Sequence, residues 1–214
     1  MTNKTGILES VMDDLLEIRP WLLFVFICLI TFLILYIKKT FIIDQITAFQ
    51  ILEERGESGI FNSLAAIQFF SIPLIYLFKF TFTGLLLWLG CAFFGYRVSF
   101  FSAWQVSAAA EFIFILPELI RIIWFMGVET DPSYWEVRAF YPLSLMQFFD
   151  YHQLAGRWHY PLKTLNIFEV IYWFMLVAGI HIKAGKKYRI ALLIVSSSYV
   201  FFFFVWLAYW AMFY

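Results

Sequence analysis

The last 25 residues of the chain, 190–214, read IALLIVSSSYVFFFFVWLAYWAMFY and contain no charged side chain. An α-helix rises about 1.5 Å per residue, so this stretch is long enough to cross the roughly 30 Å hydrocarbon core of a bilayer. A stretch of this length without a charge is typical of a membrane span. The sequence therefore predicts a transmembrane helix here.

The composition of the whole chain agrees with this prediction. Of 214 residues, 63% are hydrophobic and 14% are charged, whereas a typical soluble domain is about 45–50% apolar and about 25% charged. Aromatic residues make up 23% of the chain, and Trp and Tyr favour the two water–lipid interfaces. We expect an all-α, polytopic integral membrane protein with lipid as its main solvent.

Three more apolar stretches predict membrane spans: residues 21–37, 104–126 and 165–182. The first, WLLFVFICLITFLILYI, stops at two lysines. No cleavable signal peptide is predicted, because the residues before it are acidic and no A-x-A pattern follows it. This segment is therefore expected to remain in the membrane.

The number of spans depends on residues 61–96, which contain one charge, Lys79, in 36 residues. One interpretation is a single long helix kinked at Pro73, which gives five spans. The other is a hairpin of two short helices that turns at Lys79, which gives six. Length alone does not separate the two.

Shorter segments complete the expected organisation. Residues 1–20 form a short amphipathic segment with Ile7, Val11, Leu15 and Ile18 at helical spacing. Because its polar face is acidic, a solvent-exposed helix is the simplest interpretation, and docking on neighbouring protein is favoured over adhesion to lipid. Residues 21–214 are expected to form one transmembrane domain. Within it, 41–59 has the periodicity of an interfacial helix. Residues 127–164 form an aromatic-rich loop that an interfacial layer explains.

Basic residues predict the orientation of the chain, because cytoplasmic loops accumulate Lys and Arg. Lys183, Lys186, Lys187 and Arg189 mark one cytoplasmic loop. With five spans the N-terminus is then cytoplasmic and the C-terminus external. The lysines at 38–39 then lie on the external side, which is a mild violation of this rule. Six spans remove that violation and place the acidic N-terminus outside.

Three stretches carry a resemblance to a known family: EIRPWLLF from residue 17, GYRVSFFSAWQVSAAAEFIFILPELI from residue 95, and YPLKTLNIFEVIYWFMLVAGIHIKAGKKYRIALLI from residue 160. Together they resemble the bacterial branch of the Yip family, membrane proteins named for interacting with Ypt/Rab GTPases. The resemblance spans residues 17–213 and is most specific in the LNIFEV…AGI block.

This resemblance implies five spans, a cytoplasmic N-terminus, an external C-terminus, a bacterial inner (plasma) membrane location and no known enzymatic chemistry. The soluble region before the first span has only about 20 residues. It is shorter than the region that precedes the membrane domain in eukaryotic members, so Rab-type GTPase binding is not carried over to this chain.

Glu111, Glu118 and Arg121 are the candidate polar cluster inside the membrane. The two glutamates are seven residues apart and project from nearly the same helix face, and Arg121 is spaced to pair with Glu118. A carboxylate at bilayer depth is a functional hypothesis by default. Pro117 could kink the helix and open a polar pocket. The alternative is structural: Glu118–Arg121 as an interfacial pair and Glu111 bonded to a neighbouring helix.

Asn166 and Glu169 have the spacing of a capping box. The Asn side chain would accept a bond from a first-turn N–H, and the Glu would reach back to the cap's own N–H. Helix capping is the favoured interpretation over an ion or substrate role.

Other polar residues are assigned structural roles. Asp150, His152 and His159 match no compact metal-site spacing, and Cys28 and Cys91 lie in apolar segments without a C-x-x-C pattern. The serines at 196–198 are expected to aid helix packing. No cofactor, metal, catalytic motif or nucleic-acid-binding surface is predicted.

We therefore expect a non-enzymatic accessory or scaffold subunit that binds other membrane proteins or organises lipid. The alternative is a small permease or channel component built around Glu111, Glu118 and Arg121, for which a water-filled cavity should reach Glu111. A weaker hypothesis is an embedded enzyme that uses His152 and His159 of the 127–164 loop.

Overall fold

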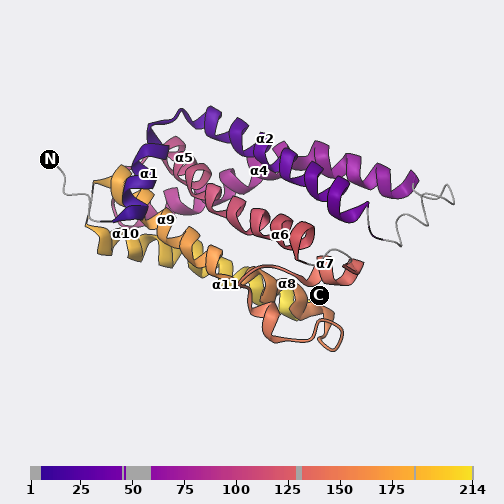
Figure 1. Ribbon diagram of the computed structural model, residues 1–214. Coiled ribbons are helices and arrows are strands. Elements are labelled where there is room, and N and C mark those ends of the chain that lie inside the picture. The colour runs from indigo at the N-terminus through magenta and orange to yellow at the C-terminus, as the bar shows by residue number, and fades with distance from the viewer. Residues whose placement is uncertain (1–5, 45, 47–58, 129–131, 186, 214) are drawn as a thin grey trace.

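The computed structural model describes residues 6–44, 46, 59–128, 132–185 and 187–213. These residues form helices and turns with no strand, and the long helices run back and forth along one axis (Figure 1). Four stretches are long and apolar enough to cross a membrane: Pro20–Ile43, Ala66–Phe93, Ile167–Ala184 and Tyr188–Phe213. The structure thus has the all-helical, multi-pass architecture of an integral membrane protein.

Helix α4 (Gly59–Phe93) is one continuous helix of 35 residues with Pro73 inside it. The hairpin interpretation with a turn at Lys79 is therefore wrong. Membrane helices tolerate an internal proline because neighbouring groups can satisfy the freed backbone carbonyl. As a consequence, Lys79 lies near the middle of the 28-residue stretch Ala66–Phe93 rather than at an end.

The predicted span at 104–126 is helical but not uniform. It runs through α5 (Phe100–Ala110), the 3-10 turn η2 (Glu111–Phe114) and α6 (Ile115–Gly127). Pro117 has no N–H, so the carbonyl of Ile113, four residues before it, lacks its usual helical hydrogen bond. Ile113 lies within the 3-10 turn η2. This stretch has three charges and is not one of the four apolar stretches above.

Helix α1 (Ile7–Glu17) packs on α5 and on α9 (Ile167–Ala184). It buries Met12 and Leu16, whereas Ile7 and Val11 of the predicted apolar stripe are exposed. The prediction of a solvent-exposed helix is therefore wrong, and the alternative, docking on neighbouring protein, is confirmed. The side chain of Gln105 fixes the end of α1, because its Nε2 donates to the carbonyls of Leu16 (3.0 Å) and Ile18 (2.7 Å).

Helix α2 (Pro20–Lys38) continues into the π-helical turn η1 (Lys39–Ile43). The predicted interfacial helix at 41–59 lies largely outside the described residues. At the C-terminal end of the chain, α10 (Tyr188–Val195), the π-helical turn η4 (Ser196–Val200) and α11 (Phe201–Phe213) follow one another. Ser198 packs against Gly90, where an added Cβ would lie 2.9 Å from the serine Cβ.

The connection between α6 and α9 forms a packed layer rather than an open loop. It contains α7 (Tyr134–Ala139), the 3-10 turn η3 (Leu145–Phe148) and α8 (Gly156–Thr164). Its rings pack on the spans: Phe140 stacks on Trp124 at 5.5 Å between centroids, and Tyr160 lies 4.6 Å from Trp210. This layer and the C-terminus lie at one end of the molecule, opposite α1 (Figure 1).

Candidate functional site

A cavity of about 590 Å³ lies between α2, α4, α6 and the start of α9, and the connection before α9 lines its outer end. Five isoleucines from α2, α4 and α6 form much of its apolar wall. Its charged lining side chains are three lysines and three glutamates: Lys38, Lys79, Lys163, Glu111, Glu118 and Glu169. The cavity therefore brings Glu111 and Glu118 of the predicted cluster together with cations from other helices.

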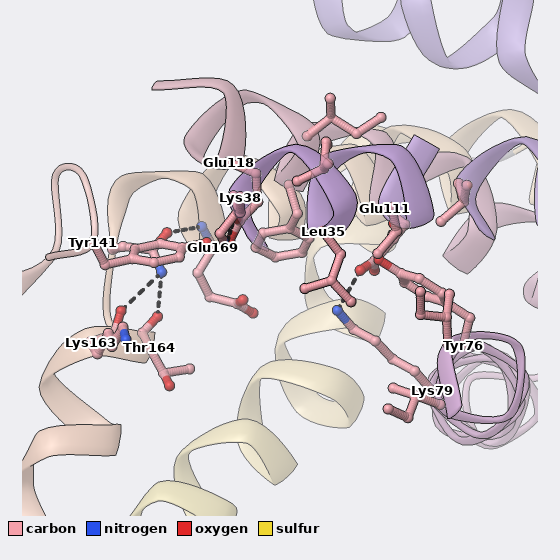
Figure 2. Close-up of a pocket in the computed structure, with 18 of the residues that line it drawn as sticks. Leu35, Lys38, Tyr76, Lys79, Glu111, Glu118, Tyr141, Lys163, Thr164 and Glu169 are labelled. Atoms are coloured by element: carbon pink, nitrogen blue, oxygen red, sulfur yellow. Dashed lines mark hydrogen bonds and ion pairs between the residues drawn. The ribbon is translucent and has the colours of Figure 1, made fainter. Parts of the chain in front are cut away.

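The inner end of the cavity is an ion pair at mid-span depth. Lys79 Nζ on α4 lies 2.6 Å from Glu111 Oε1 at the start of η2, and Figure 2 shows the two side chains pointing toward each other. The Glu111 side chain is 4% exposed and the Lys79 side chain 37% exposed. The lysine ammonium also lies 4.5 Å from the centre of the Phe114 ring. The pair holds a carboxylate where lipid alone could not solvate it.

Two hydroxyl groups belong to the same polar centre. The Tyr172 hydroxyl on α9 interacts electrostatically with Glu111 and Lys79, and Ser107 lies one turn before Glu111 on α5. Glu111 Oε2 is buried without a hydrogen-bond partner in the part of the chain that the structure describes, and the hydroxyl groups of Ser107 and Tyr172 interact with each other beside it. Unsatisfied buried oxygen atoms cost about 1–3 kcal/mol each, so packing of the surrounding helices holds this centre together.

The outer end of the cavity contains a second ion-pair group. Glu118 lies 2.6 Å from Lys38 Nζ and 3.3 Å from Arg121 Nη1, and Arg121 Nη2 donates to the Val137 carbonyl at 2.9 Å. The expected Glu118–Arg121 pair is thus present, and Lys38 is an additional partner. Neither Lys38 nor Lys79 could be assigned these partners from sequence, because 80 and 32 residues separate the paired side chains.

Asn166 and Glu169 stand at the start of α9. Asn166 Oδ1 accepts a bond from the Glu169 N–H at 2.9 Å, so Asn166 caps the helix. The Glu169 carboxylate does not make the expected return bond to the cap. It accepts instead from Trp173 Nε1 at 2.9 Å and from the Tyr199 hydroxyl at 3.1 Å. A capping box is therefore the wrong description, and Glu169 is a lining residue of the cavity.

Lys163, in α8 outside the apolar spans, has an unusual electrostatic environment. Burial, together with the neighbouring charges of Arg121 and Lys38, lowers the pKa of its ammonium group to about 8. Its Nζ donates to the Arg138 carbonyl at 2.7 Å. The environment of Lys163 could not be predicted from the sequence, because the charges around it come from three other segments.

The cavity is closed on the side of α1. Of the described residues that line it, none comes from α1, α5 or α10. Beyond Glu111, the α5 residues Val106, Ala108, Ala109 and Ala110 are buried. Gly179 of α9 meets this surface so closely that an added Cβ would lie 2.5 Å from Val106 Cγ1 and 2.7 Å from Met12 Cε. The cavity therefore stops short of the tightly packed contact between α1, α5 and α9.

The other candidate residues lie away from this cavity. Asp150 caps a local turn through bonds to His152 N (2.9 Å) and Gln153 Nε2 (2.8 Å), and His159 stacks on Tyr151 at 4.0 Å. No group of three His, Cys, Asp or Glu residues suited to a metal occurs among the described residues. Cys28 and Cys91 are free thiols.

Comparison with known proteins found no matching family model, curated protein or solved structure. The resemblance to the Yip family stays a prediction, and the function is inferred from the cavity itself.

Proposed function

We propose that the protein crosses the membrane five times, with the helical stretch 100–127 as the additional span. Ion pairs support this assignment, because Lys79, Lys38 and Arg121 neutralise its two glutamates in place. In this topology the N-terminus is cytoplasmic and the C-terminus external, in a bacterial inner membrane. Lys38 and Lys39, on the external side, are held in pairs with Glu118 and Asp44.

Within that topology we infer that the protein acts as a small permease or channel component. The observation that carries this inference is the cavity that ends at the Lys79–Glu111 pair, near the middle of the Ala66–Phe93 span. Charged groups inside a membrane commonly mark the path of a solute or ion. Here the apolar wall provides room, and the two ion-pair groups provide polar contacts along the way.

In this proposal the packed contact between α1, α5 and α9 closes the pathway on one side. Met12, Val106 and the backbone at Gly179 form the barrier on the cytoplasmic side. Passage across the membrane requires α1 or the α5–α9 contact to move, because packed interfaces switch between discrete arrangements rather than deforming continuously. The open cavity is then the external half of the pathway.

Glu111→Gln should abolish solute entry, because it removes the charge that fixes Lys79 at the inner end of the cavity. The measurement is stopped-flow light scattering of proteoliposomes challenged with potassium chloride, potassium phosphate, potassium acetate, urea or glycerol. We expect at least one solute to enter faster than into protein-free liposomes, and this gain to be lost in Glu111→Gln. Glu17→Gln, on the exposed face of α1, is the matched control and should retain it. Entry of every solute at the protein-free rate would overturn the permease function.

An accessory-subunit role is the second candidate. The exposure of α2 favours this role. In its stretch Pro20–Ile43 only 17% of the residues of the most apolar window are buried, against 50% for α9, which makes it the least buried of the four apolar stretches. Its Phe26, Leu29, Phe32 and Leu33 face outward and could contact another membrane protein instead of lipid. Co-purification after mild detergent extraction tests this role, and a strictly solitary monomer would count against it.

A further inference from the structure

The outer end of the cavity has an excess of positive charge. Lys163 interacts electrostatically with Arg121, Lys38 and Arg138, and with one carboxylate, Glu118. Among the charges that act most strongly on Lys163, three are therefore cations and one is a carboxylate. Like charges held together in a partly buried site repel one another, and a bound anion would remove that repulsion.

Two cationic side chains at this end have hydrogen-bond donors that no carboxylate in the described part of the chain accepts from. Lys163 Nζ donates to a neutral backbone carbonyl, that of Arg138, so its charge is not compensated by that bond. Arg121 Nε is buried without a partner among the described residues, although Arg121 pairs with Glu118 through Nη1. A guanidinium donor thus remains unused directly beside a cavity-lining carboxylate.

The cavity gives an anion access to this group at the depth of a membrane interface. Lys38 ends α2 and Lys163 precedes α9 by four residues, so both stand at the ends of apolar stretches. Both side chains line the cavity together with Tyr141 and Thr164, and Figure 2 shows Lys163 and Thr164 at the end opposite Lys79. The isoleucine wall begins just inside this level.

We propose that this outer end, where Lys38 and Lys163 line the cavity and Arg121 pairs with the lining residue Glu118, binds a phosphate-type oxyanion. Lys and Arg donors suit a tetrahedral anion that offers several acceptor oxygens. The anion is either free phosphate or the phosphate of a lipid headgroup, whose chains could follow the apolar wall. The inference rests on the proposed function in one respect, since it names the class of solute that enters the cavity.

The charge of Lys163 makes binding pH-dependent. Its pKa is about 8 in the ligand-free protein, lowered by burial and by Arg121 and Lys38. Below this pH the ammonium is protonated and attracts the anion, and above it the amine is neutral. Affinity should therefore fall as pH rises through about 8.

Calorimetric titration of the detergent-solubilised protein with inorganic phosphate tests the site. Lys163→Gln should weaken binding about tenfold or more, the range expected for one charge-assisted hydrogen bond. Lys163→Arg should retain most of the affinity. Arg157→Gln removes the same charge from an exposed position on the same helix and should change affinity less than about twofold. Equal phosphate affinity in Lys163→Gln and the unmodified protein would overturn the proposal.

A parallel measurement separates the two sources of the anion. Native mass spectrometry of the protein purified with phosphatidylglycerol should retain lipid on the unmodified chain, and less of it on Lys163→Gln, when a headgroup is the ligand. Phosphate binding without lipid retention would identify free phosphate as the ligand, and the absence of both would overturn the proposal.

If Lys163→Gln fails to fold, the pH dependence of phosphate affinity in the unmodified protein tests the site instead. Affinity should fall as pH rises through about 8, and an affinity that does not change with pH would contradict the site. Anion binding without solute entry would remove the permease function and leave this site standing.

Discussion

Lys79→Met should destabilise the protein more than Glu111→Leu, although the two side chains form one ion pair. Lys79→Met leaves the Glu111 carboxylate, 4% exposed, without its cation, and an uncompensated buried charge costs about 3–5 kcal/mol. Glu111→Leu leaves the Lys79 ammonium, whose side chain lines the cavity and is 37% exposed. Water in the cavity can solvate that ammonium, so the loss should be clearly smaller.

The double variant Lys79→Met/Glu111→Leu should recover most of the lost stability, because replacing a buried pair by apolar side chains is often neutral or stabilising. The free energy of unfolding in mild detergent, measured for the four members of this cycle, gives the coupling between the two residues. Lys39→Met removes a lysine from the more exposed pair with Asp44 and should cost less than about 1 kcal/mol. Equal losses in the two single variants would show that water does not reach Lys79.

Gly179→Ala should loosen the contact that closes the cavity. The new methyl group would meet Val106 at 2.5 Å and Met12 at 2.7 Å, and overpacking of this kind costs about 1–3 kcal/mol. We expect a lower free energy of unfolding and faster proteolysis at α1, whose buried side chain Met12 is displaced.

A second substitution shows whether the clash is the cause. Val106→Ala removes the methyl groups nearest to the new side chain, so Gly179→Ala should be less harmful in the Val106→Ala background than alone. Gly127→Ala, where an added Cβ meets nothing within 4 Å, is the matched control and should be neutral or slightly stabilising. If Gly179→Ala behaves like Gly127→Ala, the cavity is not closed by this contact.

Features set by local sequence could be predicted. Asn166 caps α9 through a bond to a residue three positions later, and Arg121 pairs with Glu118 across three positions. Helical spacing alone brings such groups together. The charge-free stretch at 190–214 likewise needs no partner to be recognised, because its length and apolarity predict a span by themselves.

Features set by packing between helices could not be predicted. Lys79 seemed equally suited to a turn, since its partner Glu111 lies on another helix. The buried face of α1 was misassigned because Gln105 and Gly179 of distant segments decide how that helix docks. Glu169 has the spacing of a cap residue, yet its carboxylate accepts bonds from Trp173, one turn later, and from Tyr199 of another helix.

Sidedness of thiol labelling tests most directly whether water enters to the middle of the membrane from one side only. In a background without Cys28 and Cys91, Thr31→Cys places a thiol on the cavity wall, and Val106→Cys places one in the packed end. With a membrane-impermeant reagent, Thr31→Cys should react in right-side-out vesicles and stay unreacted in inside-out ones, and Val106→Cys should react in neither. Protection of Thr31→Cys from both sides, or its labelling from the α1 side, would contradict a one-sided aqueous cavity.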